Sequence, residues 1–443
     1  MTAASKATES RTGDDAPTFY PPKQWPLMAR LVQGISYPLG WFLYKFWISV
    51  SEESVGRVRA VDNARLVFVS NHPTLEDGVT LFVLSTRLGQ LFHYIVAYES
   101  FKGLLGWFIQ RLGCYSIRRG LGDRASISQT LALLKQPRCR LVIFPEGGCS
   151  YQNDTIMPFR PGAIQLPMSV LAQQAKKATS PEQIPDFYIV PVSLKYRYQS
   201  PMKRIIEDTL TRLETELGLP IAAGDDYQRL RQVAHEVILR IEREAAREGL
   251  EDNVAEGPAE SIGWNERIDQ LRQTFIQRCE AALHIEPNLN MPIRERVYKV
   301  QAVLEEISAE DSQVAGATQT DTDKAIGENE QQPEQQSTDT LSVDREAMYW
   351  DTVRLLNFDA IYDGYVAESP TPERFLDTLT RLEREVFHLE HPQPKAPRKA
   401  CFYIGEPISL KAYLADYQRD RSGTIDQLCE DLRETLQSNL QKT

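Results

Sequence analysis

The sequence predicts an α/β fold in which helices flank a mixed sheet, with a large helical insertion. In the first half of the chain, short apolar or β-branched runs alternate with helical patterns. This alternation is typical of a sheet covered by helices. A single strand pattern then returns near the end, at ACFYIGEPISL (400–410), after a long helical block. Because a lone strand has to pair with a sheet, the block is expected to interrupt the α/β domain.

Composition and charge exclude several classes of protein. Of the 443 residues, 42% are hydrophobic and 25% are charged, which is ordinary for a globular protein and unlike a collagen, a mostly disordered chain or a polytopic membrane protein. The net charge of −11 argues against a nucleic-acid partner. The six cysteines show no C-x-x-C spacing, so we expect a reducing compartment, no disulfide framework and no metal site.

The N-terminal region is predicted to contact a membrane. Residues 1–24 are polar, lack the apolar core of a secretory signal and are expected to be a disordered tail. Residues 25–50 hold no acidic residue and many aromatics, but their longest uncharged run has 14 residues, whereas a span needs about 20. Pro38 is expected to divide this segment into two short helices. We predict a helix pair that associates with the cytoplasmic face of a membrane, and the alternative is helices that simply pack on the domain.

Residues 51–200 are predicted to form the core of the α/β domain. Its helical patterns include DGVTLFVLSTRL and ASISQTLALLKQ. Its predicted strands are RLVFVS (65–70), HYIVAY (93–98), RLVIFP (140–145) and FYIVPVSLKY (187–196).

The rest of the chain is divided by composition. Residues 201–308 carry helical patterns rich in Glu, Arg, Leu and Gln, and are predicted to be a helical insertion of unassigned role. Residues 309–343 are expected to be an acidic disordered linker, because 311–343 hold seven acidic residues, one lysine and no aromatics. Helical pattern returns over 344–397. Residues 398–443 are then predicted to supply a final strand and helix that complete the core.

The first chemical motif is RLVFVSNHPTLEDGVTL. The predicted strand ends at Asn71 and His72, a turn follows, and Asp77 stands at the start of the next helix. Histidine transfers protons near neutral pH. A carboxylate five positions later can accept a hydrogen bond from one ring nitrogen and leave the other as a base. The alternative is a histidine that only satisfies its hydrogen bonds beside a helix cap.

The second motif is RLVIFPEGGCSYQNDTIMPFRPGA, where another strand ends at Glu146, Gly147 and Gly148. The two glycines allow close approach of a ligand to the backbone. Glu146 is a candidate to hydrogen-bond a hydroxyl group, or merely to cap the next helix. Between the motifs, residues 102–140 contain eight basic residues and only one acidic residue, which indicates an anionic ligand, a lipid headgroup, an acidic partner or a solvated helix face.

Taken together, these segments resemble the glycerolipid acyltransferase family, which includes lysophosphatidic acid acyltransferases. The first motif of that family is N-H-x4-D, which corresponds here to Asn71, His72 and Asp77. Its second motif ends in an arginine, which corresponds to Arg119 in GCYSIRR (113–119).

The remaining motifs of the family follow in order. FPEGGCS (144–150) and PFRPGA (158–163) are similar to the third, F-P-E-G-T-R-S with P-F-x-x-G-A. IVPVSL around Pro191 is similar to the fourth, and GEPI (405–408) to the strand that commonly comes after it. The resemblance therefore covers about residues 50–200 and 400–443.

The resemblance implies a reaction and a set of roles. His72, oriented by Asp77, would deprotonate an acceptor hydroxyl that attacks an acyl thioester directly. The acceptor site would include Arg119, Glu146, Gly147, Asn71, Arg160 and Pro191, with Arg119 on the acceptor's phosphate. Acyl-coenzyme A or acyl-acyl carrier protein would be the co-substrate, with no bound cofactor or metal. The first-choice acceptor is 1-acylglycerol-3-phosphate in a membrane, which would give phosphatidate.

Two departures keep other possibilities open. Gly148 and Cys149 stand where the family has Thr and Arg, and Arg160 or Arg118 is a candidate to compensate. Otherwise the acceptor is glycerol-3-phosphate, another lysolipid or an alcohol without phosphate. A catalytically idle membrane adaptor and a soluble thioesterase or hydrolase are the alternatives from other classes. The hydrolase lacks support because no G-x-S-x-G motif is present.

Overall fold

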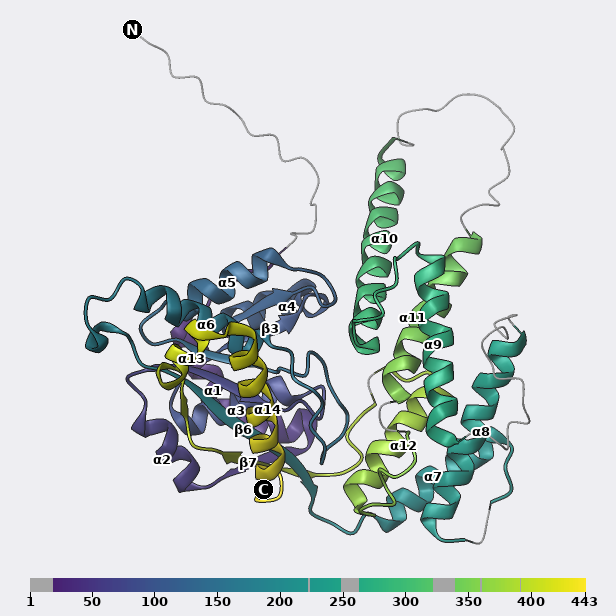
Figure 1. The fold of residues 1–443 in the computed structure, drawn as a ribbon. Helices are drawn as coiled ribbons and strands as arrows, with labels where there is room; N and C mark the ends of the chain where they lie inside the picture. The colour runs from purple at the N-terminus through teal and green to yellow at the C-terminus, as the bar shows by residue number, and fades with distance from the viewer. Residues whose placement is uncertain (1–18, 222–223, 248–262, 322–338, 359–360, 391) are drawn as a thin grey trace.

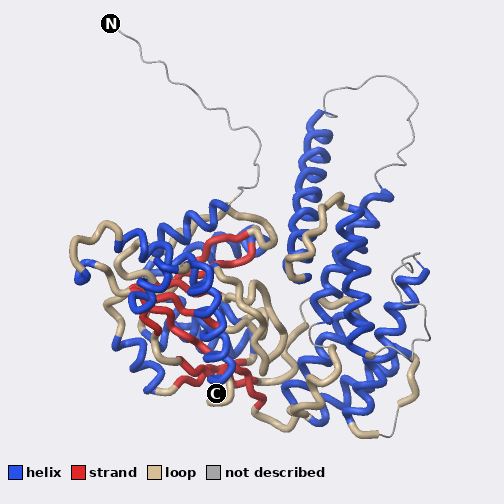
Figure 2. Tube along the Cα trace, viewed as in Figure 1, coloured by secondary structure: helices blue, strands red, loops and turns tan. Residues whose placement is uncertain are grey.

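The computed structural model describes residues 19–221, 224–247, 263–321, 339–358, 361–390 and 392–443, and the side chains of all of these except 309–321 and 339–344. It has two parts, one with a central sheet and one built from helices (Figures 1 and 2). Most of the predicted 1–24 tail, residues 1–18, lies outside the described residues.

The sheet has eight strands in the order β1-β7-β6-β2-β5-β3-β4, with β8 also paired to β6. Strands β6, β2, β5, β3 and β4 are parallel to one another, whereas β7 is antiparallel to β6 and parallel to β1. This is the mixed sheet that the sequence predicts. The strand bounds are β1 Phe46–Val50, β2 Arg65–Ser70, β3 His93–Ala97, β4 Cys114–Ile117, β5 Arg140–Ile143, β6 Phe187–Tyr198, β7 Arg398–Ile404 and β8 Ile408–Ser409.

Helices cover both faces of the sheet because its strand residues alternate between two cores. In β2, Leu66 and Phe68 pack in one core with α2 and α3, and Val67 and Val69 pack in the other with α5, α6, α13 and α14. The helices of this domain are α1 Pro26–Tyr44, α2 Glu52–Ala60, α3 Asp77–Leu88, α4 Gly103–Arg111, α5 Arg124–Leu134, α6 Gly162–Ala175, α13 Leu414–Arg419 and α14 Arg421–Asn439.

The helical part is inserted between two neighbouring strands. β6 ends at Tyr198, which is paired in register with Arg398, the first residue of β7. The insertion therefore leaves and re-enters the sheet at one point. Its helices share a hydrophobic core of their own, and they are α7 Lys203–Leu217, α8 Asp226–Arg247, α9 Trp264–Ala282, α10 Ile293–Asp321, α11 Asp339–Asn357 and α12 Pro372–Val386.

The helices extend further than the sequence indicates. α10 continues to Asp321 and α11 begins at Asp339, so both reach into the predicted linker 309–343. Residues 309–321 contain no proline and a single glycine, so little in them ends a helix. The middle of the predicted linker, 322–338, lies outside the described residues.

Residues 25–50 form one helix and one strand, so the prediction of a helix pair is wrong. α1 continues through Pro38, and β1 begins two residues after α1 ends. Proline removes the hydrogen bond to the carbonyl of Gly34, but Gly34 and Pro38 are both exposed, so that carbonyl is not left unpaired in the core. β1 forms because β7, distant in the sequence, pairs with it.

α1 packs on the domain with its polar and small residues. Gln33 donates hydrogen bonds to Ser85 Oγ (2.7 Å) and to the carbonyl of Gln90 (2.8 Å). Its large apolar residues face outward instead, the reverse of an ordinary amphipathic helix on a soluble domain. The exposed ones are Leu27, Leu31, Ile35, Leu39, Trp41, Phe42 and Leu43. Among the described residues, no helix has both the length and the hydropathy that crossing a bilayer requires.

α4 exposes apolar residues next to α1. Leu104, Leu105 and Trp107 are exposed, and α4 packs against α1. The backbone N–H of Trp25, just before α1, also donates to the carbonyl of Arg111 at the end of α4 (2.9 Å). We call the exposed apolar residues of α1 and α4 the apolar face.

Candidate active site

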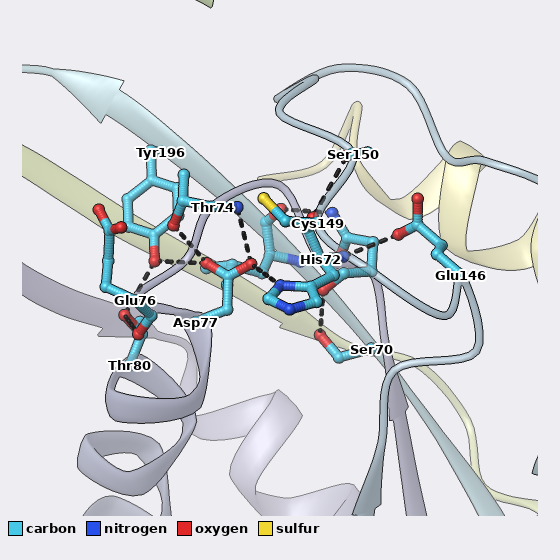
Figure 3. A network of polar contacts seen from close by, with 12 residues as sticks. Ser70, His72, Thr74, Glu76, Asp77, Thr80, Glu146, Cys149, Ser150 and Tyr196 are labelled. Atoms are coloured by element: carbon cyan, nitrogen blue, oxygen red, sulfur yellow. Dashed lines mark hydrogen bonds and ion pairs between the residues drawn. The ribbon is translucent and has the colours of Figure 1, made fainter. Parts of the chain in front are cut away.

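His72 and Asp77 meet at the carboxyl end of β2. His72 lies in the loop after β2, and Asp77 is the first residue of α3. His72 Nδ1 is 2.8 Å from Asp77 Oδ2 (Figure 3). A carboxylate at this position accepts the Nδ1 proton, so the neutral ring presents Nε2 as an acceptor. The spacing predicted from the sequence therefore does bring the two side chains together.

Three further donors hold Asp77, whose side chain is fully buried. Thr74 donates from its backbone N–H to Oδ2 (2.9 Å) and from its hydroxyl to Oδ1 (2.7 Å). The hydroxyl of Tyr196 donates to Oδ1 (2.8 Å), and Figure 3 shows it on the other side of Asp77 from His72. A carboxylate with this many hydrogen bonds is fixed in position.

The ring of His72 is positioned but still accessible. It stacks on Phe144, with ring centroids 4.3 Å apart, and its side chain is 18% exposed. Within the described part of the chain, Nε2 has no hydrogen-bond partner. This nitrogen can therefore accept a proton from a hydroxyl group brought to it.

Glu146 joins the two motif loops. Parallel strands β2 and β5 are adjacent, so the loops after them lie at the same edge of the sheet. The buried carboxylate of Glu146 accepts hydrogen bonds from the backbone N–H of His72 (2.7 Å) and of Met157 (3.0 Å). Burial raises the pKa of this carboxyl to about 7. Glu146 thus positions the His72 backbone, and its predicted contact with the acceptor stays a prediction.

Asn71, directly after β2, and Pro191, on β6, lie at the same edge of the sheet. The side chain of Asn71 forms two hydrogen bonds with the backbone of Leu194, both 2.8 Å long. Pro191 is buried at the point where the β6 partner changes from β8 to β7, so its missing N–H leaves no gap in either ladder. Asn71 thus ties β6 to the loop after β2, and the substrate contacts predicted for both residues stay predictions.

The two predicted acceptor-site arginines both meet α10. Arg119 follows β4; its Nη2 is 3.5 Å from Glu99 Oε1, and its guanidinium lies 4.7 Å from the centre of the Tyr298 ring. Arg160 Nε is 3.2 Å from Glu295 Oε1, and its guanidinium lies 5.8 Å from the same ring. Tyr298 and Glu295 were not among the predicted site residues, because no role was predicted for the insertion that contains α10.

Of the two arginines named as candidates to compensate for Gly148 and Cys149, Arg160 lies at the FPEGGCS loop. Gly147 has φ +74°, and a side chain there would collide with Arg160. Arg160 therefore lies beside this loop, whereas Arg118, the other candidate to compensate, stacks on Tyr98 and is 3.6 Å from Glu306. Cys149 is buried, and burial holds the pKa of its thiol well above the usual range, which does not suit a nucleophile.

The helical part also holds the segment after the FPEGGCS loop. Arg381 of α12 is fully buried; its Nη2 donates to the carbonyl of Ser150 (3.2 Å), and its guanidinium lies 3.4 Å from the centre of the Tyr151 ring. The N–H of Asn153 donates to Asp377 of α12 (3.0 Å). The insertion is therefore part of the wall behind the site.

Tyr196 and Thr74 are the other residues that the sequence analysis missed. Thr74 had a local signal, because a threonine three residues before an aspartate can bond to it in a turn. Tyr196 had none, because a tyrosine in an apolar strand looks like any core residue. Within the described ranges, no group of His, Cys, Asp and Glu side chains is arranged to hold a metal ion.

Comparison with known proteins finds a family match within the sheet domain. Residues 50–195 match the family model described as Acyltransferase, whereas no curated protein matches the chain significantly. The matched segment contains His72, Asp77, Arg119 and Glu146, and it ends before the helical insertion. The resemblance predicted from the motifs is confirmed at the level of this family, over these residues.

Proposed function

We propose that this protein is a membrane-surface O-acyltransferase that moves a fatty acyl group from a thioester to the hydroxyl of a lysophospholipid, with 1-acylglycerol-3-phosphate as the first acceptor and phosphatidate as the product. The observation that carries this proposal is the His72–Asp77 pair, 2.8 Å apart, inside the segment that matches the acyltransferase family.

The reaction needs one base. His72 Nε2 accepts the proton of the acceptor hydroxyl while the hydroxyl oxygen attacks the thioester carbonyl. The new C–O bond forms, the C–S bond breaks, and the imidazolium returns its proton to the departing thiolate. Asp77 stabilises the imidazolium, and Thr74 and Tyr196 keep Asp77 in place. Alcohol and thioester become ester and thiol, and no acyl-enzyme is formed.

The donor is an acyl thioester of coenzyme A or of acyl carrier protein, used as a co-substrate. Both carry anionic groups that suit the basic residues of segment 102–140. Arg140 does not count among these, because it is buried and bonds to the carbonyls of Ala64 and Cys139 and to Asp62. The exposed basic residues of segment 102–140 are better placed to contact coenzyme A or acyl carrier protein.

The apolar face supports association with a membrane. Leu31 and Phe42 of α1 and Leu104 of α4 are 66%, 82% and 88% exposed. Each large apolar side chain gains roughly 1.5–3 kcal/mol when it leaves water. We propose that the apolar face lies in the headgroup boundary on the cytoplasmic side, and that the lysolipid acceptor reaches His72 from the bilayer.

The test is an acyl-transfer assay with the purified full chain and vesicles. Acyl-coenzyme A and acyl-acyl carrier protein are each paired with lysophosphatidate, glycerol-3-phosphate and an unphosphorylated alcohol, and His72→Ala is run beside the wild type. Labelled phosphatidate that disappears in His72→Ala supports the proposal. Product from the alcohol alone overturns the phosphorylated acceptor. If no donor and acceptor pair gives product, the proposal that the protein is an enzyme is contradicted, and a catalytically idle adaptor is favoured.

A further inference from the structure

α10 packs on the site at two glycines. A Cβ added at Gly148 would lie 1.7 Å from the Tyr298 hydroxyl oxygen, and one added at Gly120 would lie 2.3 Å from the backbone nitrogen of Lys299. A side chain at either position would therefore have to displace the Tyr298 ring or the backbone of α10. The two core loops therefore lack side chains at the places where α10 approaches, and α10 forms a wall of the site.

The ring of Tyr298 gathers two arginines. The guanidinium groups of Arg119 and Arg160 both lie over it, and a cation over an aromatic ring is held by its quadrupole. Arg119 comes from the end of β4 and Arg160 from the loop before α6, so the ring is what places their charges together.

Each of the two arginines has an N–H donor without a hydrogen-bond partner. Arg119 Nε and Arg160 Nη2 are buried, and neither has a hydrogen-bond partner within the described residues. A buried donor without a partner is costly, and native structures rarely keep one. Here two such donors belong to guanidinium groups that lie over the same tyrosine ring. They indicate a ligand with several acceptor oxygens, such as a phosphate monoester.

α10 adds a third cation. Arg294 Nη1 donates to the carbonyl of Cys149 (3.1 Å), which places its charge at the FPEGGCS loop. The electrostatic influence of Arg294 also reaches Glu146. Carboxyl groups also lie near two of these cations, Glu99 and Glu305 near Arg119 and Glu295 at Arg160. Beside these carboxylates, Arg119 Nε and Arg160 Nη2 still have no hydrogen-bond partner among the described residues.

We propose that α10 completes the acceptor's phosphate site, with Tyr298 aligning Arg119 and Arg160 and with Arg294 supplying charge at the FPEGGCS loop. The inference rests on the proposed function for the identity of the acceptor. It makes Tyr298 and Arg294 specificity-determining residues that discriminate a phosphorylated acceptor from an unphosphorylated one.

The test compares Arg294→Gln and Tyr298→Leu with a conservative variant, Tyr298→Phe, and with one control, Arg204→Gln. Tyr298→Phe keeps the ring, and Arg204→Gln removes an exposed arginine of α7. Michaelis constants are measured for lysophosphatidate and for monoacylglycerol. A lost charge-assisted contact is expected to raise KM for lysophosphatidate about 10- to 100-fold, with KM for monoacylglycerol unchanged in the same variants. Arg204→Gln should behave like the wild type, and Tyr298→Phe should raise KM for lysophosphatidate less than Tyr298→Leu does, because the ring that holds the two guanidinium groups is kept.

A binding readout separates this inference from the proposed function. Inorganic phosphate and glycerol-3-phosphate should raise the Tm of the wild type and of Arg204→Gln, and should not raise that of Arg294→Gln or Tyr298→Leu. Wild type that binds phosphate but transfers no acyl group contradicts the proposed function and leaves the site supported. Normal transfer without phosphate stabilisation overturns the site. Equal KM changes for both acceptors, or faster transfer in Tyr298→Leu, also overturn it, because α10 would then be a structural support or a block.

Discussion

The hydroxyl of Tyr196 donates a 2.8 Å hydrogen bond to Asp77 Oδ1, across 119 residues of sequence. The same hydroxyl lies 2.8 Å from Thr80 Oγ1. Tyr196 stands on β6 and Asp77 on α3, so the bond ties the helix that carries the carboxylate to the centre of the sheet. Tyr196 acts on His72 only through Asp77, and we regard it as a positioning residue.

Tyr196→Phe is expected to lower kcat about 10-fold with little change in KM, because the loss of one hydrogen bond to a carboxylate loosens the orientation of His72. Asp77→Asn should lower kcat on the order of 10³-fold. Steady-state kinetics of both variants and of the double variant check this. If the two residues act together, Tyr196→Phe should cost almost nothing in the Asp77→Asn background. Strictly additive losses would contradict the positioning role.

His72→Ala should reduce acyl transfer by roughly 10²- to 10⁴-fold, which is the usual contribution of a general base. The Tm should fall by only a few degrees, because Asp77 keeps its bonds to Thr74 and Tyr196. His235→Ala, at an exposed position on α8, is the matched control and should retain wild-type activity. A His72→Ala enzyme with most of its activity would exclude this residue as the base.

Glu146 should make the protein less stable as pH rises. Its folded pKa of about 7 lies above its ordinary value of 4.5. Between these pH values the unfolded chain loses the proton first, which lowers the free energy of the unfolded state relative to the folded state. The free energy of unfolding should therefore fall between about pH 4.5 and 7, on the order of 3 kcal/mol, relative to Glu146→Gln. Urea unfolding of both proteins from pH 4 to 8 measures it. Parallel pH curves for the two proteins would contradict the assignment.

The apolar face should be needed for vesicle binding. Leu31→Glu with Leu104→Glu places charges on α1 and α4, and we expect at least a 10-fold loss of binding in a vesicle sedimentation assay. Leu289→Glu is the control, because this leucine is 77% exposed but lies in the helical part. If the double variant still sediments with vesicles and Leu289→Glu does not, the membrane contact lies on the insertion.

Much of the sheet follows from local pattern. The predicted strands at 65–70, 93–98, 140–145 and 187–196 correspond to β2, β3, β5 and β6 within about two residues at either end. β1 was predicted as helix, because FWISV continues the apolar pattern of α1 and only its pairing with β7 makes it a strand. β4, with four residues, is too short for a period to be read.

The sequence by itself determined the chemistry at the strand ends: a histidine with a carboxylate five positions later, a glutamate before two glycines, and the order of these motifs. Such features are local, because they depend on spacing within one strand, turn and helix. Only the tertiary structure decided that Tyr196 holds Asp77, that Glu146 supports the His72 backbone and that Tyr298 gathers two arginines. These contacts join segments that are distant in the chain. The hydrophobic periodicity of a sequence shows which face of a helix is apolar, but it does not show which face packs on the rest of the protein. For α1 it is the polar face that packs on the domain.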